Sequence, residues 1–448
     1  MKRREFLHNS AKTFIALTGA AAMVTRKTYA ANNRIVMGAM GLGGRGRDHA
    51  RMLAHRDDVW MKYVCDPDMS RIGNFPDQLE RQQDKPVTAV QDLRRILEDP
   101  EVDAICVAAC DHWHGPATVW ACQAGKDVYV EKPASHNIWE GRVMVEAARK
   151  YNRVVQVGTQ NRSAPYIHEA RDYIASGKLG DIPLIKIYNL KPGGAWRCPP
   201  DSETPDGVDY DLYLGPAQKR RFNRGHFHDG WKKWWAYSGG DAADDGSHQI
   251  DIACMLLGDP APPTAVYGVG GKYAYPDADG DAPDTQAVTF EYPGFVMTFE
   301  LTQYTPYMAK TSGESRDTDK FPHWPTNATR IELYGKRGLM YVGRHGGGWQ
   351  VVGPGDRITD EMSGRQHTLE HHADFIACIR DRKQPNGDIE SGHKSAMLIH
   401  LGNIATALSG RRLIFDAETE QITNDDEANN HILRKREYRD GYGIDGIV

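Results

Sequence analysis

The chain has 448 residues, which is enough for two domains with separate hydrophobic cores. Hydrophobic residues make up 40% of it, an ordinary share, and no stretch approaches the ~20 uninterrupted apolar residues of a membrane-spanning helix. The formal net charge is −5 and becomes more negative once the basic N-terminal segment is set aside, which argues against a general nucleic-acid-binding protein.

Residues 1–30 have the features of a twin-arginine export signal. Arg3 and Arg4 precede a mildly apolar stretch at 14–24, and Ala30 offers a small-residue cleavage site. The alternative is a basic, unstructured N-terminus. We expect the mature protein to be periplasmic or otherwise exported. Because the twin-arginine route carries folded proteins, a nucleotide could be bound before export.

The next stretch, 34–46, predicts a dinucleotide-binding turn. An apolar run leads into G-x-G-x-x-G at Gly41, Gly43 and Gly46, and a short helix is expected from there to His55. Gly41 permits a tight turn and Gly43 lets the backbone approach a pyrophosphate, while Gly46 lets the helix pack on the strand.

Asp66 supplies the second part of this motif. It ends the strand expected at 59–65, about 20 residues beyond the last glycine, where an acid binds the ribose hydroxyls of NAD. The alternative is a turn residue before Pro67. Because no arginine directly follows Asp66, NAD is favoured over NADP, although Arg71 lies near in sequence.

Strand and helix patterns alternate from residue 34 to about 158. This alternation predicts a doubly wound parallel sheet, and we assign 31–158 to a Rossmann domain of an α/β protein. Further strands are expected at 102–109, 127–130 and 154–158, and helices at 116–125 and 140–151.

The pattern changes after residue 158, where short strands are separated by glycine and proline turns. This predicts a largely antiparallel sheet in a second, C-terminal domain over 159–448. Its strands are expected at 182–190, 265–269, 287–290, 296–301, 330–334 and 339–342. Helices are expected at 369–382 and 390–409, the polar segment 310–327 is interpreted as a substrate-facing loop, and the polar tail from 418 is expected to wrap the surface.

Polar clusters follow two strands of the first sheet, at the edge where ligands bind in doubly wound folds. The first is DHWH at 111–114, and the second is EKP at 131–133, in which Pro133 is a candidate for a cis peptide bond.

A third cluster, at 244–251, combines carboxylates with a histidine. If it opens a helix, Asp244 and His248 are i,i+4 neighbours, with Asp251 and His248 as an i,i+3 alternative. Such a histidine can accept a hydroxyl proton near neutral pH, and the carboxylate can orient it or bind an adjacent hydroxyl. A divalent-metal site and a plain helix cap beside a solvated histidine are the other interpretations.

Aromatic residues just before this cluster could stack on a sugar or fill the core: Trp231, Trp234, Trp235 and Tyr237. His226 and His228 are undecided in the same way, whereas His371 and His372 are expected to be structural. The seven cysteines contain no C-x-x-C pair, so we predict neither a disulfide framework nor a metal site from them.

Taken in chain order, these motifs resemble those of the glucose–fructose oxidoreductase / inositol dehydrogenase (Gfo/Idh/MocA) family. The resemblance rests on GxGxxG, Asp66, DHWH, EKP, GTQNR at 158–162 and DxGxH at 244–248, and it spans nearly the whole mature chain. It implies a Rossmann domain plus an α+β domain with an open-faced sheet and NAD(P) at their junction. The open sheet is expected to form a homo-oligomer.

The resemblance also implies roles for single residues. Lys132 would polarise the reacting hydroxyl or carbonyl, His248 would be the general base or acid, and Asp244 would be its partner on the substrate. The residues expected at the cofactor are Gly41, Leu42, Gly43, Gly44, Arg45, Gly46, Asp66, Asp111, His112, Trp113, His114, Glu131, Lys132 and Gln160. Those expected at the substrate are Arg162, Tyr166, Trp234, Trp235, Asp244 and His248.

The leading hypothesis is an exported, NAD-dependent oxidoreductase acting on a hydroxyl of a sugar, glycoside or polyol. Because free NAD is scarce outside the cytoplasm, we expect the cofactor to be tightly held. One alternative is an NAD-dependent glycoside hydrolase that oxidises a hydroxyl transiently, eliminates the leaving group, adds water and reduces the ketone again. Two others are a non-catalytic sugar-binding protein and a metal-dependent hydrolase.

Overall fold

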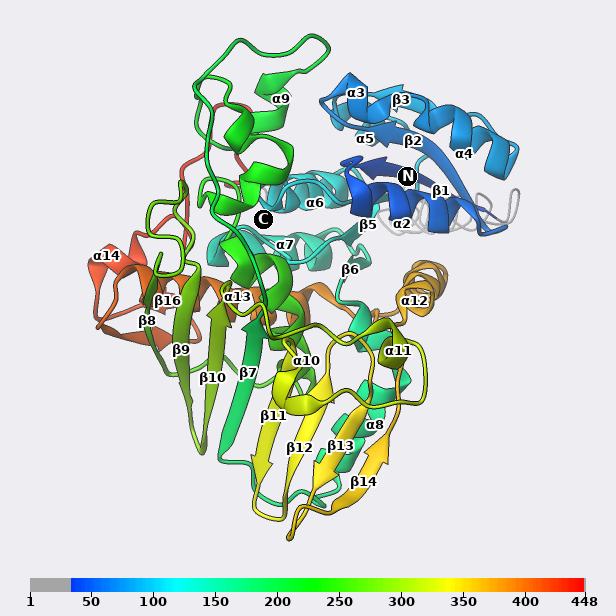
Figure 1. Cartoon of the computed structure of the whole chain (residues 1–448). Helices are drawn as coiled ribbons and strands as arrows, with labels where there is room; N and C mark the ends of the chain where they lie inside the picture. Colours follow the sequence, from blue (N-terminus) through cyan, green and yellow to red (C-terminus); the bar gives the residue numbers. More distant parts are fainter. Residues whose placement is uncertain (1–33, 447–448) are drawn as a thin grey trace, which may run out of the picture.

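The computed structural model describes residues 34–446, so the predicted export signal at 1–30 lies outside the described residues. Two sheets dominate the fold, a smaller one from the first part of the chain and a larger one from the second (Figure 1). Helix α13 (Ile389–Ala407) connects their layers, because it contacts α7 (Ile138–Lys150) of the first and strands β8 (Ala265–Gly271) and β9 (Thr285–Tyr292) of the second.

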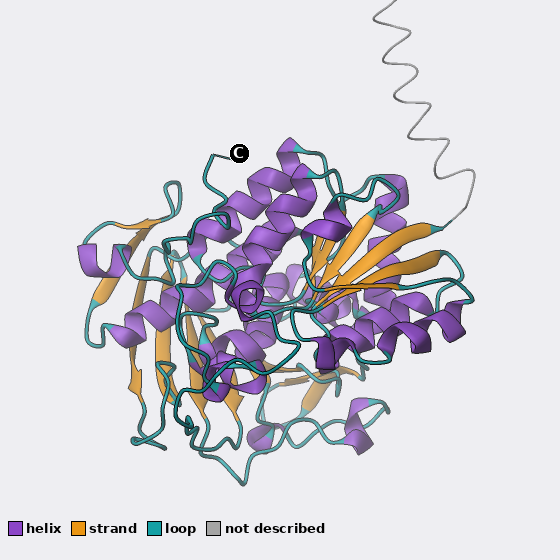
Figure 2. Cartoon of the chain, turned by 90° about the horizontal axis from the view of Figure 1, so that it is seen from above, coloured by secondary structure: helices purple, strands orange, loops and turns teal. Residues whose placement is uncertain are grey.

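The first sheet has the strand order β3-β2-β1-β4-β5-β6, and every neighbouring pair is parallel. Its strands are β1 (Ile35–Met40), β2 (Val59–Cys65), β3 (Thr88–Val90), β4 (Ala104–Val107), β5 (Asp127–Val130) and β6 (Val155–Val157). Helices lie on both sides of this sheet (Figure 2), which is why every residue of β4 and β5 is buried. The predicted Rossmann topology is confirmed.

The helices of this layer are α2 (Gly44–Ala54), α3 (Met69–Ile72), α4 (Phe75–Gln83), α5 (Arg94–Leu97), α6 (His114–Gln123) and α7. Local sequence explains the start of α7, because the Asn137 side chain accepts a hydrogen bond from the Glu140 amide at 2.9 Å. Its apolar residues, Val143 and Met144 among them, face the sheet and are buried.

The second sheet has ten strands in the order β14-β13-β12-β11-β7-β10-β9-β8-β15-β16. Strands β7 and β10 pair in parallel and the other neighbouring strands are antiparallel, as predicted. Besides β8 and β9 the strands are β7 (Leu184–Leu190), β10 (Phe295–Thr302), β11 (Arg330–Gly335), β12 (Gly338–Gly343), β13 (Trp349–Val352), β14 (Ile358–Met362), β15 (Arg412–Asp416) and β16 (Gln421–Ile422).

One face of this sheet packs against helices α10 (Ser247–Leu256) and α13, and α8 (Pro165–Ala175) contacts α10. Strand β9 shows the resulting alternation, since Val288 and Phe290 are buried on the helix side. The other face presents Tyr267, Val269 and Val296, which are 38%, 39% and 37% exposed. A homo-oligomer through this face stays a prediction.

The predicted helices at 369–382 and 390–409 correspond to α12 (Thr368–Asp381) and α13. The short helices α9 (Tyr210–Leu214), α11 (Gly313–Arg316) and α14 (Asp426–Asn429) complete the set in the described part of the chain. Among the helices between residues 34 and 446, none combines the length and hydropathy that a membrane span requires.

The expectation that the polar tail only wraps the surface is wrong. After residue 418 the chain adds β16 to the large sheet, buries Leu433 in the core of that layer, and then buries Ile444 in the core of the first layer. Widely spaced apolar residues in a polar segment show no strand or helix period, so the sequence pattern concealed this packing.

Candidate active site

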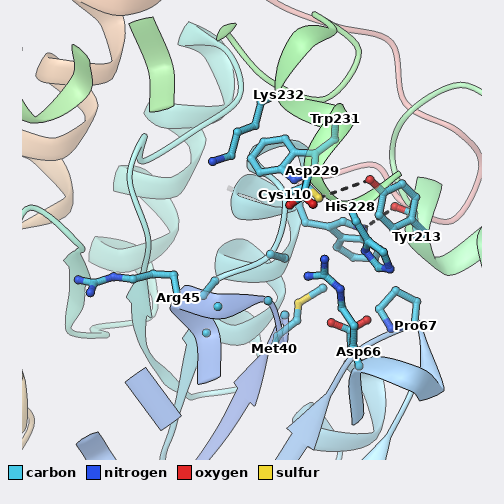
Figure 3. A pocket seen from close by; sticks show the side chains of 18 residues that line it. Met40, Arg45, Asp66, Pro67, Cys110, Tyr213, His228, Asp229, Trp231 and Lys232 are labelled. Atoms are coloured by element: carbon cyan, nitrogen blue, oxygen red, sulfur yellow. Dashed lines mark hydrogen bonds between the residues drawn. The ribbon is translucent and has the colours of Figure 1, made fainter. Parts of the chain in front are cut away.

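Two neighbouring cavities open at the carboxyl edge of the first sheet, where the strand order reverses between β1 and β4. The first has a volume of about 220 Å³ and the second about 400 Å³. Arg45 lines both, so they adjoin. Around the first cavity, Asp66 lies on one side, and Trp231 and Lys232, from the second half of the chain, lie on the other (Figure 3).

The glycine turn lines the first cavity, and two of its glycines leave no room for a side chain. Gly41 has a φ of 87°, and a Cβ added there would lie 2.5 Å from the Ala108 carbonyl oxygen. A Cβ on Gly46 would lie 1.8 Å from the Gly41 carbonyl oxygen. Because Gly43, at the N-cap of α2, makes no side-chain cap, the first amides of this helix are available to a phosphate group.

Asp66 stands at the end of β2, where its carboxylate accepts hydrogen bonds from the Leu42 amide at 2.7 Å and the Asp68 amide at 3.0 Å. These bonds fix the carboxylate beside the turn, and burial raises its pKa. Each carboxylate oxygen has two lone pairs, so both can still accept a ribose hydroxyl. The turn, the open helix end and Asp66 therefore fit a dinucleotide.

The EKP segment follows β5, and its Glu131 and Lys132 line the second cavity. Its Lys132–Pro133 peptide bond is cis, as the sequence suggested. Glu131 accepts hydrogen bonds from the His49 ring at 2.7 Å and from the Gln160 amide at 3.0 Å. Burial raises the pKa of Glu131, but His49 and the Arg45 charge outweigh burial and hold the pKa well below its usual range. An ionised Glu131 thus anchors the residue next to Lys132.

Lys132 reaches into the second cavity and meets Asp244. Its ammonium group donates to the Asp244 carbonyl oxygen and, at 3.0 Å, to the Asp244 carboxylate. Lys232 donates to the other carboxylate oxygen at 2.9 Å. Burial raises the pKa of the Asp244 carboxyl, but the charges of Lys132 and Lys232 outweigh it and hold the pKa well below its usual range.

Asp244 lies in a π-helical turn, Ala242–Gly246, that leads directly into α10. The sequence predicted a helix opening here but not this wider turn, a form often found at functional sites. Gly246 is needed because a Cβ there would lie 2.6 Å from the Phe299 ring. The turn therefore lies close against β10, and both Asp244 and His248 face the second cavity.

His248 lines the second cavity with its ring, and neither ring nitrogen has a hydrogen-bond partner among residues 34–446. Burial, together with the positive charges of Arg344 and Lys132, lowers the pKa of His248 well below 6.5. The imidazole is therefore neutral near pH 7 and can accept a proton.

Of the DHWH segment, only Trp113 lines the first cavity within the described residues. His112 and His114 are buried behind it, and one ring nitrogen of His114 lies 2.7 Å from the Pro133 carbonyl oxygen. Asp111 accepts a hydrogen bond from Ser238 at 2.6 Å, and burial raises its pKa to about 7. These three side chains support the cavity wall instead of lining it, which corrects the sequence-based expectation.

Four side chains predicted at the substrate do not reach the second cavity. The Arg162 guanidinium is 3% exposed and pairs with Asp251 at 2.8 Å and Asp259 at 2.6 Å, so it ties helix elements together. Tyr166 is buried and donates to the Gly343 carbonyl oxygen at 2.8 Å. Trp234 and Trp235 pack against hydrophobic core clusters, so for these two residues the alternative interpretation, core packing, is the one that the structure shows.

The structure adds charged residues that the motifs did not single out. Asp245 lies beside Asp244 and pairs with Lys310 at 2.6 Å, Lys191 at 3.0 Å and Arg344 at 3.4 Å. Lys310 belongs to the segment interpreted as a substrate-facing loop, which does reach the cavity. Arg344 follows β12 and carries no sequence signal, because only the sheet topology brings it here.

No group of three or more His, Cys, Asp or Glu side chains between residues 34 and 446 is placed to hold a metal ion. Asp244 and His248 are not part of such a group. The Asp244 carboxylate instead pairs with two ammonium groups, those of Lys132 and Lys232.

Three parts of the chain match known protein families. Residues 35–159 match the model described as "Oxidoreductase family, NAD-binding Rossmann fold". Residues 216–341 match the "GFO/IDH/MocA C-terminal domain", and residues 357–442 match the "Oxidoreductase family, C-terminal alpha/beta domain". The chain belongs to the Gfo/Idh/MocA oxidoreductase family. The matched NAD-binding Rossmann region, 35–159, supplies the glycine turn and Asp66 of the first cavity.

Similar members of the Gfo/Idh/MocA family include scyllo-inositol 2-dehydrogenase (NAD(+)) of Bacillus subtilis, 24% identical over 77% of this chain and 86% of that protein. The oxidoreductase YrbE of the same organism is 25% identical over 58% of this chain, and the chain spans 64% of its length, less than two thirds. A structure of levoglucosan dehydrogenase with NADH and levoglucosan has a TM-score of 0.60 at 18% identity, over 84% of this chain and 98% of that one.

Proposed function

We propose that this protein is an NAD-dependent oxidoreductase acting on a hydroxyl group of a sugar, glycoside or polyol. The observation that carries the proposal is the convergence of Lys132, Asp244 and His248 in one cavity that adjoins the NAD site. The names of related proteins, an inositol dehydrogenase and a levoglucosan dehydrogenase, support a carbohydrate or polyol substrate.

Oxidation of the hydroxyl breaks its O–H bond and the adjacent C–H bond and leaves a C=O bond. NAD, when bound, supplies the acceptor for the hydride and its electron pair. His248, neutral and without a hydrogen-bond partner in the described chain, takes the hydroxyl proton. In the opposite direction the same ring returns the proton.

Lys132 stabilises the reacting oxygen in this scheme. An ammonium group has three N–H donors, and two of those of Lys132 are used by the carbonyl and carboxylate of Asp244. The third can point at the substrate oxygen, where charge develops in the transition state. Asp244, held ionised, fixes the ammonium and can accept a neighbouring sugar hydroxyl.

We further propose that the protein is exported by the twin-arginine route with its NAD tightly held, as the N-terminal sequence suggests. Release into a compartment poor in NAD would otherwise leave the enzyme without cofactor. The exposed face of the large sheet is the surface proposed for a homo-oligomer.

The test uses purified protein and a panel of sugars deuterated at their C–H positions. After incubation the protein is denatured and the released nucleotide is analysed by mass spectrometry. We expect deuterium on the nicotinamide and a keto-sugar in solution. Protein that releases no nicotinamide nucleotide and takes up none would contradict the proposal. Hydrolysis of a nitrophenyl glycoside without net reduced nucleotide would instead favour the glycosidase alternative.

A further inference from the structure

The second cavity is unusually cationic for a site that binds a neutral sugar. Its lining holds six basic residues and three acidic ones, and both sets come from both halves of the chain. The basic residues are Arg45, Lys132, Lys191, Lys310, Arg316 and Arg344. The acidic ones are Glu131, Asp244 and Asp245.

The three acidic residues are already neutralised by local partners. Asp245 lies within 3.4 Å of three of the basic side chains, and Asp244 is paired with Lys132 and Lys232. Glu131 is held by Arg45 and His49. Two charged residues just outside the lining leave the net charge around the cavity unchanged. Lys232 adds a positive charge, and Asp241, paired with Lys191 at 2.8 Å, adds a negative one.

Of the six basic residues that line the cavity, Arg316 is the one that takes part in none of these ion pairs. Within residues 34–446 its guanidinium pairs with no carboxylate and donates to the Thr311 carbonyl oxygen at 3.2 Å, while its Nε is buried without a partner. Arg344 also has a buried Nε without a partner. Two arginines that line this cavity therefore have N–H donors for which the described chain supplies no acceptor.

The positive groups at this end also crowd one another. Burial lowers the pKa of Arg344, and the nearby charge of Arg316 lowers it further. Burial lowers the pKa of His345, which lines the same end, to about 2, and the charges of Arg344, Lys310 and Arg316 contribute. Like charges gathered out of water cost free energy unless a counter-charge binds among them.

We propose that the substrate is an anionic sugar, whose carboxylate or phosphate group binds between Arg316 and Arg344 while the reacting hydroxyl faces Lys132 and His248. The planar guanidinium groups match the paired oxygens of either anion. This rests on the proposed function, since it names the substrate class of the same cavity. Neutral polyols of the inositol type are the contrasting substrate class.

The test is calorimetric titration of the purified protein carrying its nucleotide. The probes are hexoses, the matching hexuronates and the matching hexose 6-phosphates, each in gluco, galacto and manno configuration. We expect one anionic form to bind at least about tenfold more tightly than its neutral parent, with a ratio that falls as salt is raised. Whether that form is the hexuronate or the phosphate identifies the anion.

Variants test the position of the anion. Arg316→Gln is expected to bring the ratio of anionic to neutral affinity close to one. Lys320→Gln, an exposed residue that lies outside the cavity lining, is the matched control and should leave the ratio unchanged. Neutral hexoses that bind as tightly as both anionic forms, no binding by any probe, or an Arg316→Gln variant with an unchanged ratio would overturn the inference.

Titration requires no turnover, so the two proposals can fail separately. If anionic sugars bind selectively but no deuterium reaches the nucleotide, the proposed function fails and the anion site stands. If neutral sugars bind better and are oxidised, the inference of an anion site fails and the proposed function stands.

Discussion

At the scale of single residues, the surroundings of the two groups proposed to react keep His248 neutral and fix the position of Lys132. His248 is neutral because burial and neighbouring positive charges lower its pKa well below 6.5. Lys132 is fixed by an ionised Asp244. Hydroxyl oxidation needs this combination, since one group must take a proton while another stabilises the oxygen.

Replacing His248 with Asn is expected to slow hydride transfer by about 10²–10⁴-fold, because an amide cannot take the hydroxyl proton. Nucleotide occupancy should change little, since the first cavity, proposed to hold the rest of the nucleotide, is lined by other residues. Rapid-mixing measurement of nicotinamide reduction gives the rate, and mass spectrometry of released nucleotide gives the occupancy. His55→Asn, an exposed position after α2, is the control. Transfer at the wild-type rate would exclude His248 as the base.

Asp245 is expected to stabilise the fold in a pH-dependent way. Burial raises the pKa of its carboxyl, but the charges of Arg344, Lys191 and Lys310 outweigh burial and hold the pKa well below 3.8. A depressed folded-state pKa contributes stability that is present above the unfolded pKa, near 4, and is lost as the pH falls. Asp245→Asn should therefore lower the free energy of unfolding by about 3–5 kcal/mol at neutral pH.

The difference in free energy of unfolding between Asp245→Asn and the wild type should become smaller as the pH falls below about 4. Urea unfolding across that range measures it, and the exposed Asp206→Asn should stay within about 0.5 kcal/mol of the wild type throughout. A stability difference that grows as the pH falls would contradict the lowered pKa of Asp245.

At this scale the sequence predicted the residues that sit in fixed-spacing motifs: the glycines, Asp66, Lys132, Asp244 and His248. It could not predict Arg344, because the position of this residue depends on which strands of the second sheet end at the cavity. Arg316 lies in the segment 310–327 that was predicted to face the substrate, but no motif singled it out. It also could not show that Arg162 is occupied by Asp251 and Asp259, since that contact joins segments about 100 residues apart in sequence.

At the scale of elements, the turn between β1 and α2 depends on close backbone approach. Gly46→Ala places a methyl group 1.8 Å from the Gly41 carbonyl oxygen, whereas Gly44→Ala meets nothing within 4 Å. We expect the first change to cost about 1–3 kcal/mol and to abolish nucleotide retention. The second should leave the stability of nucleotide-free protein equal or slightly higher. Thermal unfolding of both variants compares them, and equal losses would contradict the role of the turn.

Elements with a strong period were predicted closely, as the buried parallel strands and helices α12 and α13 illustrate. Strands β13 to β16 were missed because two to five residues in polar surroundings show too little alternation. The π-helical turn at Ala242–Gly246 was missed because its extra residue is stabilised by packing on β10 and not by local propensity.

At the scale of the whole molecule, the C-terminal segment connects the two layers beside the wall of the first cavity. Arg436 pairs with Glu140 at 2.5 Å, with side-chain exposures of 3% and 0%. Arg436 also donates to the His112 carbonyl oxygen at 2.6 Å, and Tyr438 donates to Glu140 at 2.6 Å. The last part of the chain thus supports the segment that carries Trp113.

Arg436→Met is expected to lower the free energy of unfolding by about 3–5 kcal/mol, because it leaves the Glu140 carboxylate buried without its counter-charge. Lys435→Met, next in sequence but exposed, should cost about 1 kcal/mol or less, since its ion pair with Asp445 lies at the surface. Denaturant unfolding separates the two. Similar small losses would show that the tail does not lock the layers.

The most direct single measurement is a crystal structure of the purified protein with its nicotinamide nucleotide. We predict that the pyrophosphate lies against Gly41–Gly46, that a ribose hydroxyl meets Asp66, and that the nicotinamide ring enters the second cavity within contact of Lys132 and His248. A nucleotide bound elsewhere, or one whose ring points away from both side chains, would contradict the proposed chemistry.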